Sequence, residues 1–297
     1  MSAAASALAG QRSQLQGLAL CDWQLPAGKA ARATVLIVHG LGEHMGRYAA
    51  LAQALNSWGY SVRAYDQYGH GASEGPRGGL PTATRLLDDL ALVVDHTRAT
   101  VAAGQALLLL GHSMGGLVAA RFVALQRRPV DALVLSSPAL DPGLNPVQKL
   151  LVAVLPALLP NLRVGNGLDA RLISHDPAVV AAYQSDPLVH DRIAARLARF
   201  IADDSAAVLA AAPAWTLPTL LLYAGADKLV NPAGSRAFAA AAPVQVLSSQ
   251  CFEPLYHEIF NESEPGRSQV LAALRAWLDT RYTPPTFLGA SANGQIS

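Results

Sequence analysis

Gly111-His-Ser-Met-Gly115 is the stretch of this 297-residue sequence that decides its fold. The apolar run Ala106-Leu-Leu-Leu-Leu110 precedes it and is typical of a buried parallel strand. Residues 116–125 follow without a helix breaker and favour a helix. A strand, a tight glycine turn and a helix in this order lift a serine hydroxyl to the top of a sheet. We therefore expect an α/β sheet with Ser113 as a nucleophile at its carboxyl edge.

A serine hydroxyl is a weak nucleophile until a base accepts its proton and an acid orients that base. In this arrangement the acid, and then the histidine, follow the serine along the chain. Asp227 comes shortly after the apolar strand Thr219–Ala224, and His257 follows the next expected strand, Val244–Ser248. The carboxyl ends of parallel strands meet at one edge of a sheet, so Ser113, Asp227 and His257 are predicted to converge there.

The chain offers other candidates for the acid and for the base. Asp141 also follows a strand, Asp131–Ser136, but Asp227 lies one strand before the histidine and is preferred. His257 is preferred among the eight histidines because it has both the required order and a loop position. The other histidines precede or adjoin the serine, or fall in the helical stretch described below: His39, His44, His70, His96, His112, His175 and His190.

Acyl transfer also needs backbone N–H groups that bind the developing oxyanion, and losing one such donor costs roughly 3 kcal/mol. The early buried strand Thr34–Val38 runs directly into His39-Gly-Leu-Gly42. Glycines in this position let a ligand approach the backbone closely. The predicted donors are the N–H groups of Leu41 and Met114.

Composition agrees with a large apolar core and excludes several other classes. Hydrophobic residues make up 52% of the chain and charged residues 14%, and the formal net charge of +1 gives no reason to expect a nucleic-acid partner. Cys21 and Cys251 form neither a disulfide framework nor a thiolate metal site. His257-Glu258 begins like a zinc-protease helix, but Asn261 stands at the second histidine position. We expect no metal and no cofactor.

We expect no targeting segment. The first ten residues lack the basic start and long apolar region of a signal peptide. No run reaches the roughly 18 apolar residues of a membrane span. A cytoplasmic location is therefore expected.

Between residues 141 and about 205, short apolar strands give way to helical patterns at 147–159, 177–185 and 187–202. We predict a helical cap over the carboxyl ends of the sheet, which would exclude water and shape an apolar acyl tunnel. The predicted parts are a first core segment, the cap, a second core segment and a disordered tail, at residues 1–140, 141–208, 209–282 and 283–297. The stretch 150–159 lacks the basic face of an interfacial helix, so burial in the cap is preferred over contact with a membrane surface.

These motifs resemble those of the α/β-hydrolases of the monoacylglycerol lipase and lysophospholipase group, over about residues 34 to 278. The similar stretches are His39–Tyr48, Ala64–Gly75, Gly111–Gly116, Ser185–Leu188, Gly225–Val230 and Tyr256–Glu262. The resemblance implies the α/β-hydrolase fold, with a mostly parallel sheet flanked by helices and an inserted helical cap. It also implies a serine esterase that releases one fatty acid from a monoacylglycerol or a similar single-chain lipid ester.

The resemblance places Glu43 and Arg47 near the polar glycerol end of the substrate. A carboxylate and a guanidinium can grip vicinal hydroxyls. Alternatively, the two side chains pair with each other and brace the loop. One departure from the family is Ser249–Leu255, which replaces an expected short turn before the histidine and puts glycerol specificity in question.

The same motifs are compatible with other functions. A lysophospholipase or a broad carboxylesterase would use the same residues, and an alcohol in place of water would make the enzyme an acyltransferase. An aminopeptidase or amidase would add an acidic anchor for the substrate ammonium, for which the cap offers Asp169, Asp176, Asp186 and Asp191. Ser113 excludes hydrolases with a carboxylate nucleophile, and a complete triad disfavours a non-catalytic binding protein. The expected partner is a small lipid ester, with transient membrane contact through the cap as an alternative.

Overall fold

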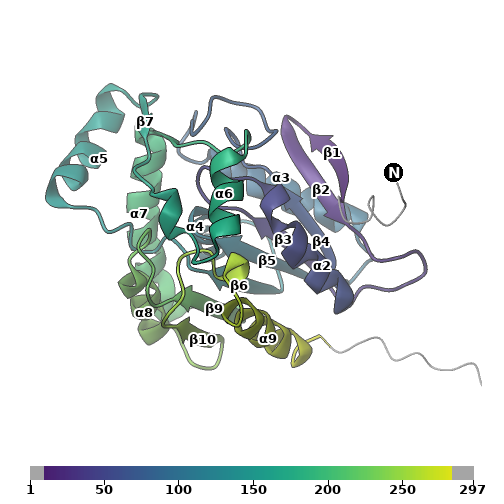
Figure 1. Ribbon diagram of the computed structural model, residues 1–297. Coiled ribbons are helices and arrows are strands. Elements are labelled where there is room, and N and C mark those ends of the chain that lie inside the picture. The colour runs from purple at the N-terminus through teal and green to yellow at the C-terminus, as the bar shows by residue number, and fades with distance from the viewer. Residues whose placement is uncertain (1–9, 283–297) are drawn as a thin grey trace, which may run out of the picture.

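The computed structural model describes residues 10–282 (Figure 1), so the predictions for the amino-terminal segment and the tail 283–297 concern residues outside it. Within this range eight strands form one sheet in the order β1-β2-β4-β3-β5-β6-β9-β10, and two short strands pair separately. The strands of the main sheet are β1 (Gln11–Leu15), β2 (Leu18–Trp23), β4 (Ser61–Tyr65), β3 (Thr34–Val38), β5 (Leu107–His112), β6 (Ala132–Ser136), β9 (Thr219–Ala224) and β10 (Leu247–Phe252). The helices are α2 (Ala49–Ser57), α3 (Arg85–Thr100), α4 (Met114–Ala124), α5 (Pro146–Leu158), α6 (Pro177–Ser185), α7 (Ala195–Ala211), α8 (Pro232–Ala241) and α9 (Gly266–Asp279).

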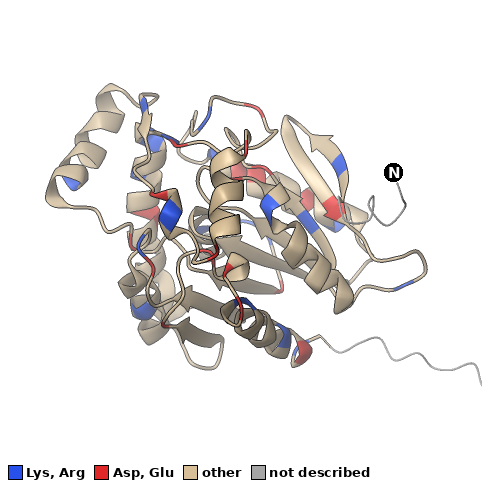
Figure 2. Cartoon of the chain, viewed as in Figure 1, with Lys and Arg blue, Asp and Glu red and all other residues tan. Residues whose placement is uncertain are grey.

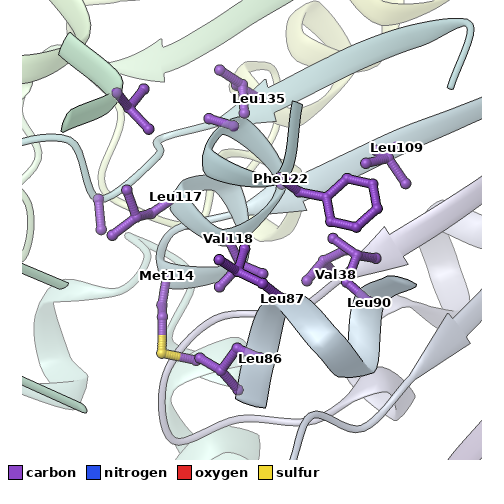
Figure 3. Packing of buried hydrophobic residues seen from close by; sticks show 14 of the residues in the cluster. Val38, Leu86, Leu87, Leu90, Leu109, Met114, Leu117, Val118, Phe122 and Leu135 are labelled. Carbon is purple, nitrogen blue, oxygen red and sulfur yellow. The ribbon is translucent and has the colours of Figure 1, made fainter. Parts of the chain in front are cut away.

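The sheet is parallel from β4 to β10, and only β1 and β2 run antiparallel to their neighbours. Helices cover both faces, because successive strand residues point to opposite sides. Val38, Leu109 and Leu135 pack on one face in a cluster with residues of α3, α4, α7 and α8 (Figure 3). Ile37 and Leu110 point to the other face, where α2 and α9 lie. The predicted mostly parallel sheet flanked by helices is confirmed.

Two predicted elements lie elsewhere in the structure. The last strand was expected at 244–248 but β10 begins at Leu247, because a turn closed by the Val246 N–H on the Pro243 carbonyl (3.1 Å) comes first. The stretch Ser249–Leu255, expected to replace a short turn before His257, therefore begins as part of this strand, up to Phe252. The helix expected at 187–202 begins only at Ala195, after a turn in which Asp186 accepts the Leu188 N–H (2.8 Å) and the short strand β8 (Arg192–Ala194).

The predicted cap, residues 141–208, contains α5, α6, most of α7 and β8 with its antiparallel partner β7 (Arg163–Gly165). Its boundaries stay a prediction, and α7 continues beyond them to Ala211. The preferred burial of residues 150–159 is wrong. Helix α5 contains no buried residue; it lies at the outer edge of the molecule and packs against α7. Within residues 10–282, no helix is both long and apolar enough to cross a membrane.

The glycines of the elbow allow α4 to lie directly against β3. A Cβ atom on Gly115 would stand 2.1 Å from the Val38 carbonyl oxygen and 2.3 Å from that of His39. These atoms belong to the backbone at the end of a central strand and just after it, so they cannot move aside as a flexible side chain could. The close approach fixes the start of α4, and therefore the serine before it, relative to the end of β3.

We predict that Gly115→Ala destabilises the protein by about 1–3 kcal/mol or more, the usual cost of overpacking. Thermal denaturation followed by circular dichroism measures the loss. Gly165→Ala is the matched control, since no atom lies within 4 Å of the Cβ it would add. Equal melting temperatures for the two variants would contradict this account of the elbow.

Candidate active site

Ser113 stands between the last residue of β5 and the first residue of α4, in a backbone conformation that few residues adopt. Its φ of 54° and ψ of −123° are strained for a residue with a Cβ atom. The Ser113 N–H donates to the Ser136 carbonyl of the neighbouring strand (3.0 Å), which holds the turn in place. As the first helical residue, Met114 has an N–H without an acceptor inside the helix. That group is available to a substrate oxygen.

The loop after β3 lies beside the serine. A Cβ atom on Gly40 would stand 3.2 Å from the Ser113 Cβ, so the loop and the elbow are in contact. Leu41, Ser113 and Met114 line the same pocket. The structure thus brings the two predicted oxyanion donors and the predicted nucleophile to one cavity wall.

Asp227 and His257 are in direct contact. Their Oδ2 and Nδ1 atoms are 2.6 Å apart, and the other Asp227 oxygen accepts the N–H groups of Leu229 (2.8 Å) and Val230 (3.0 Å). Burial alone would lower the pKa of His257, but the adjacent Asp227 carboxylate raises it above its ordinary value of 6.5. Burial would raise the pKa of Asp227, whereas His257 and the two N–H groups lower it below its ordinary 3.8. The pair is a hydrogen-bonded acid and imidazole.

His257 packs against the elbow through the residue before the serine. The ring of His112, the residue before Ser113, lies 4.7 Å from the His257 ring between centroids. Burial, and then the nearby His257, lower the pKa of His112 to about 3. His112 therefore stays neutral and contributes packing, with Nδ1 near the Ser136 carbonyl and hydroxyl (both 3.1 Å).

The competing candidates have other partners. Asp141 accepts a hydrogen bond from the Asn231 amide (2.7 Å), so it is not placed against a histidine. His39, His70 and His190 pack ring against ring, with neighbouring centroids 5.3 and 4.7 Å apart. The remaining three alternatives are paired with carboxylates or lie on a helix: His44 with Asp186, His175 with Glu262, and His96 on α3.

The pocket at Ser113 encloses about 130 Å³ and is mainly apolar. Core residues form one side of it. The cap contributes the other side through Leu144, Val152, Asn166, Leu168, Ile193, Ala198 and Ile201. The described residues that line it include no carboxylate. Among residues 10–282, no group of three or more histidine, cysteine, aspartate or glutamate residues is placed to hold a metal ion.

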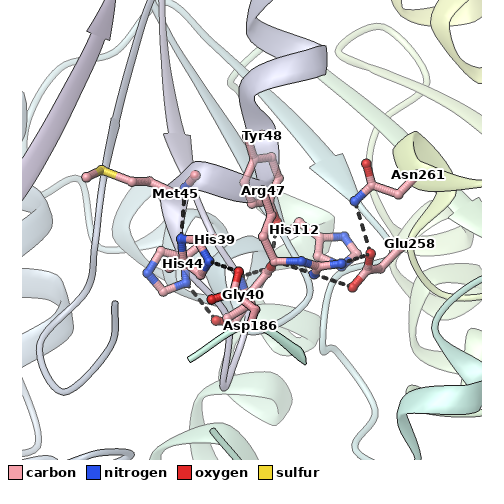
Figure 4. A network of polar contacts seen from close by, with 12 residues as sticks. His39, Gly40, His44, Met45, Arg47, Tyr48, His112, Asp186, Glu258 and Asn261 are labelled. Carbon is pink, nitrogen blue, oxygen red and sulfur yellow. Dashed lines mark hydrogen bonds and ion pairs between the residues drawn. The ribbon is translucent and has the colours of Figure 1, made fainter. Parts of the chain in front are cut away.

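Glu43 and Arg47 belong to a buried network of charges beside the loop that follows β3 (Figure 4). Arg47 forms an ion pair with Glu43 (2.9 Å) and a forked pair with Glu258 (2.5 and 2.7 Å). Burial would raise the pKa of Glu43, but Arg47 lowers it to about 2. Burial would lower the pKa of Arg47, but the two carboxylates raise it above its ordinary range. Glu43 and Arg47 therefore stay charged across the physiological pH range.

Sequence reasoning did not single out Glu258 as a member of the site. The residue follows His257 directly, and its carboxylate also accepts the Asn261 amide (3.0 Å). Tyr48, whose hydroxyl donates to Glu43 (2.6 Å), was missed as well. Only 14% of the residues are charged, so the opposite charges at positions 43, 47 and 258 could have been noticed in the sequence as candidate partners. Only the fold shows that they pair with one another.

A strained serine elbow at the carboxyl edge of a parallel sheet, with an Asp-His pair on the loops of the last two strands, defines an α/β-hydrolase. The chain belongs to the serine aminopeptidase S33 family, whose model matches residues 29–264. The expected resemblance to the monoacylglycerol lipase group is confirmed.

Two related proteins and one crystal structure illustrate this similarity. A monoacylglycerol lipase of Mycolicibacterium smegmatis is 35% identical over 255 residues, which are 83% of this chain and 88% of the relative. The phospholipase YtpA of Bacillus subtilis is 32% identical and covers 83% of this chain and 95% of its own length. The crystal structure of Paleococcus ferrophilus monoacylglycerol lipase superposes with a TM-score of 0.80 at 34% identity, over 89% of this chain and 98% of that one. These comparisons support a lipase or esterase.

The contact between Asp227 and His257 predicts the titration of the imidazole. We expect His257 to take up its proton at a pH above 6.5, and Asp227→Asn to lower that pKa because the stabilising carboxylate is lost. NMR of labelled imidazole nitrogens measures both values. His112 is an internal control, since it stays neutral down to about pH 3. A wild-type His257 pKa at or below 6.5 would contradict the contact.

Proposed function

We propose that the protein is a serine esterase that releases a fatty acid from a monoacylglycerol or a similar single-chain lipid ester. The observation that carries the proposal is the Asp227–His257 pair packed against His112 of the elbow, whose next residue, Ser113, lines an apolar pocket. The paired residues supply base and orienting acid, and the pocket suits an acyl chain. The names of the relatives support glycerol as the alcohol.

The mechanism follows from these positions. His257 Nε2 accepts the Ser113 proton as the hydroxyl oxygen attacks the ester carbonyl, while Asp227 holds the imidazole in the required tautomer. The N–H groups of Leu41 and Met114 bind the oxyanion. The ester C–O bond then breaks, and His257 gives its proton to the leaving alcohol. A water molecule, activated by the same imidazole, cleaves the acyl-enzyme and frees the acid and the serine.

The pocket favours an ester over the aminopeptidase alternative. An aminopeptidase needs an anion for the substrate ammonium, yet the described residues lining the pocket carry no carboxylate. The cap aspartates considered as this anion have partners in the cap or in the loop that follows β3 (residues 39–44). Asp169 pairs with Arg171, Asp176 caps α6, Asp186 pairs with His44 and Asp191 pairs with Arg192. A phospholipase on a single-chain substrate is the second candidate, favoured by the name of the Bacillus relative.

We also propose that α5 contacts a lipid surface. Leu150, Leu151, Val154 and Leu158 are 49–72% exposed, and the helix carries a single charge, Lys149 (Figure 2). Val152 of the same helix lines the pocket, so the apolar surface is continuous with the catalytic cavity. A cavity of about 150 Å³ holds a six-carbon benzene ring, so the distal part of a long acyl chain must extend beyond the 130 Å³ pocket.

The proposed activity predicts release of fatty acid from monoacylglycerols by the purified protein. Ser113→Ala should lower kcat by about three or more decades, because the nucleophile is lost while the fold persists. Lysophospholipid and an aminoacyl anilide run in parallel, and Ser57→Ala, on the exposed side of α2, is the control. Turnover of the anilide alone, or unchanged activity of Ser113→Ala, would contradict the proposal.

The lipid-contact proposal predicts a selective loss of activity. The double variant Leu150→Ser/Leu158→Ser should hydrolyse long-chain monoacylglycerol in vesicles more slowly by several-fold, because apolar surface for docking is removed. Hydrolysis of a water-soluble short-chain ester should be unchanged. Val244→Ser, at a position that is 83% exposed outside α5, serves as the matched control. Equal losses on both substrates would argue against docking through α5.

A further inference from the structure

One guanidinium joins three segments that lie far apart in the sequence. Arg47 lies in the 3-10 turn after the oxyanion loop (residues 39–44), and its side chain is 10% exposed. It binds Glu43 of that loop and Glu258 of the histidine loop (residues 255–262). Its Cζ also lies 4.7 Å from the ring centroid of Tyr183, on cap helix α6. Figure 4 shows the guanidinium between the two loops.

The two ion pairs of Arg47 each end next to a group of the proposed catalytic site. Glu43 Oε1 accepts the Gly40 N–H (2.6 Å), which belongs to the residue before Leu41. Glu258 directly follows His257, and its own N–H donates to the Ile173 carbonyl of the cap (2.8 Å). A shift of Arg47 would therefore move an oxyanion donor and the general base relative to each other.

We propose that Arg47 is a positioning residue of the hydrolase, which fixes the oxyanion loop, the histidine loop and α6 in one arrangement. The inference rests on the proposed function, since it concerns the same oxyanion donor and base. It differs from the contact with the glycerol head group that the family resemblance implied. Both terminal nitrogens of Arg47 donate to carboxylates of the protein, and the network is buried.

The role requires arginine rather than any cation. A planar guanidinium can donate to two carboxylates at once with a fixed angle between them, whereas a lysine ammonium is a single point charge on a flexible stem. The flat guanidinium also stacks on the Tyr183 ring, which an ammonium cannot do. Arg47→Lys thus keeps the charge and loses the geometry.

The test uses two esters of the same acyl chain, a monoacylglycerol and an aryl ester without hydroxyl groups on the alcohol. Arg47→Lys and Glu258→Gln should each lower kcat by about 10–100-fold on both esters, since small misplacements of reacting groups cost this much. KM should change far less than kcat. The combined variant should be no slower than the slower single variant, because both changes disable one unit.

Control variants separate positioning from general destabilisation. Arg63→Lys alters another buried fork, between Arg63 and Asp22 (2.6 and 3.0 Å) on β4 and β2. It should lower the melting temperature and leave kcat unchanged at assay temperatures below it. Glu258→Gln preserves side-chain shape, so it supplies the measurement if Arg47→Lys fails to fold.

The outcomes are distinct. A rise in KM for the monoacylglycerol alone, with kcat unchanged, would overturn the inference and favour a head-group contact. Wild-type kcat in Arg47→Lys and Glu258→Gln, or losses that multiply in the combined variant, would also overturn it. Wild-type protein without Ser113-dependent hydrolysis of either ester would instead overturn the proposed function.

Discussion

The contact between the elbow and the end of β3 is the constraint on which the site depends. Ser113 can hold its positive φ only because the backbone on both sides is fixed, by the Ser136 carbonyl and by the approach of Gly115 to the carbonyls of Val38 and His39. The same approach sets the distance between α4 and the oxyanion loop. The proposed nucleophile and the two proposed oxyanion donors are thus positioned by backbone packing, before any side chain contributes.

Side chains complete the arrangement through charge. The interior near the pocket is apolar, and a charge there is stable only with partners. Asp227 has His257 and two N–H groups, while Arg47 has Glu43 and Glu258. Both clusters lie on loops that leave the carboxyl edge of the sheet, where the proposed chemistry occurs. The two hydrophobic clusters of the core consist of aliphatic and aromatic side chains.

Sequence patterns predict those parts of the fold that depend on short-range signals. Uninterrupted apolar runs located β3 and β9 to the residue, and the glycine pattern located the elbow. Strand β10 was misplaced because Val244 looks like a strand residue, whereas a turn at Pro243 leaves it exposed. The burial of α5 was predicted wrongly for a similar reason, because the sequence of an apolar helix does not show whether the helix faces the core or the solvent. The pairing of Arg47 with Glu258 spans 211 positions and no local pattern carries it.

The central claim is that Ser113 is an activated nucleophile, and covalent labelling tests it most directly. Treatment with a fluorophosphonate, followed by intact mass spectrometry and peptide mapping, reports which residue reacts. The account predicts one adduct per chain, on Ser113, and a strongly slowed reaction in His257→Ala because the base is missing. An unmodified Ser113, or an adduct on another residue, would contradict it.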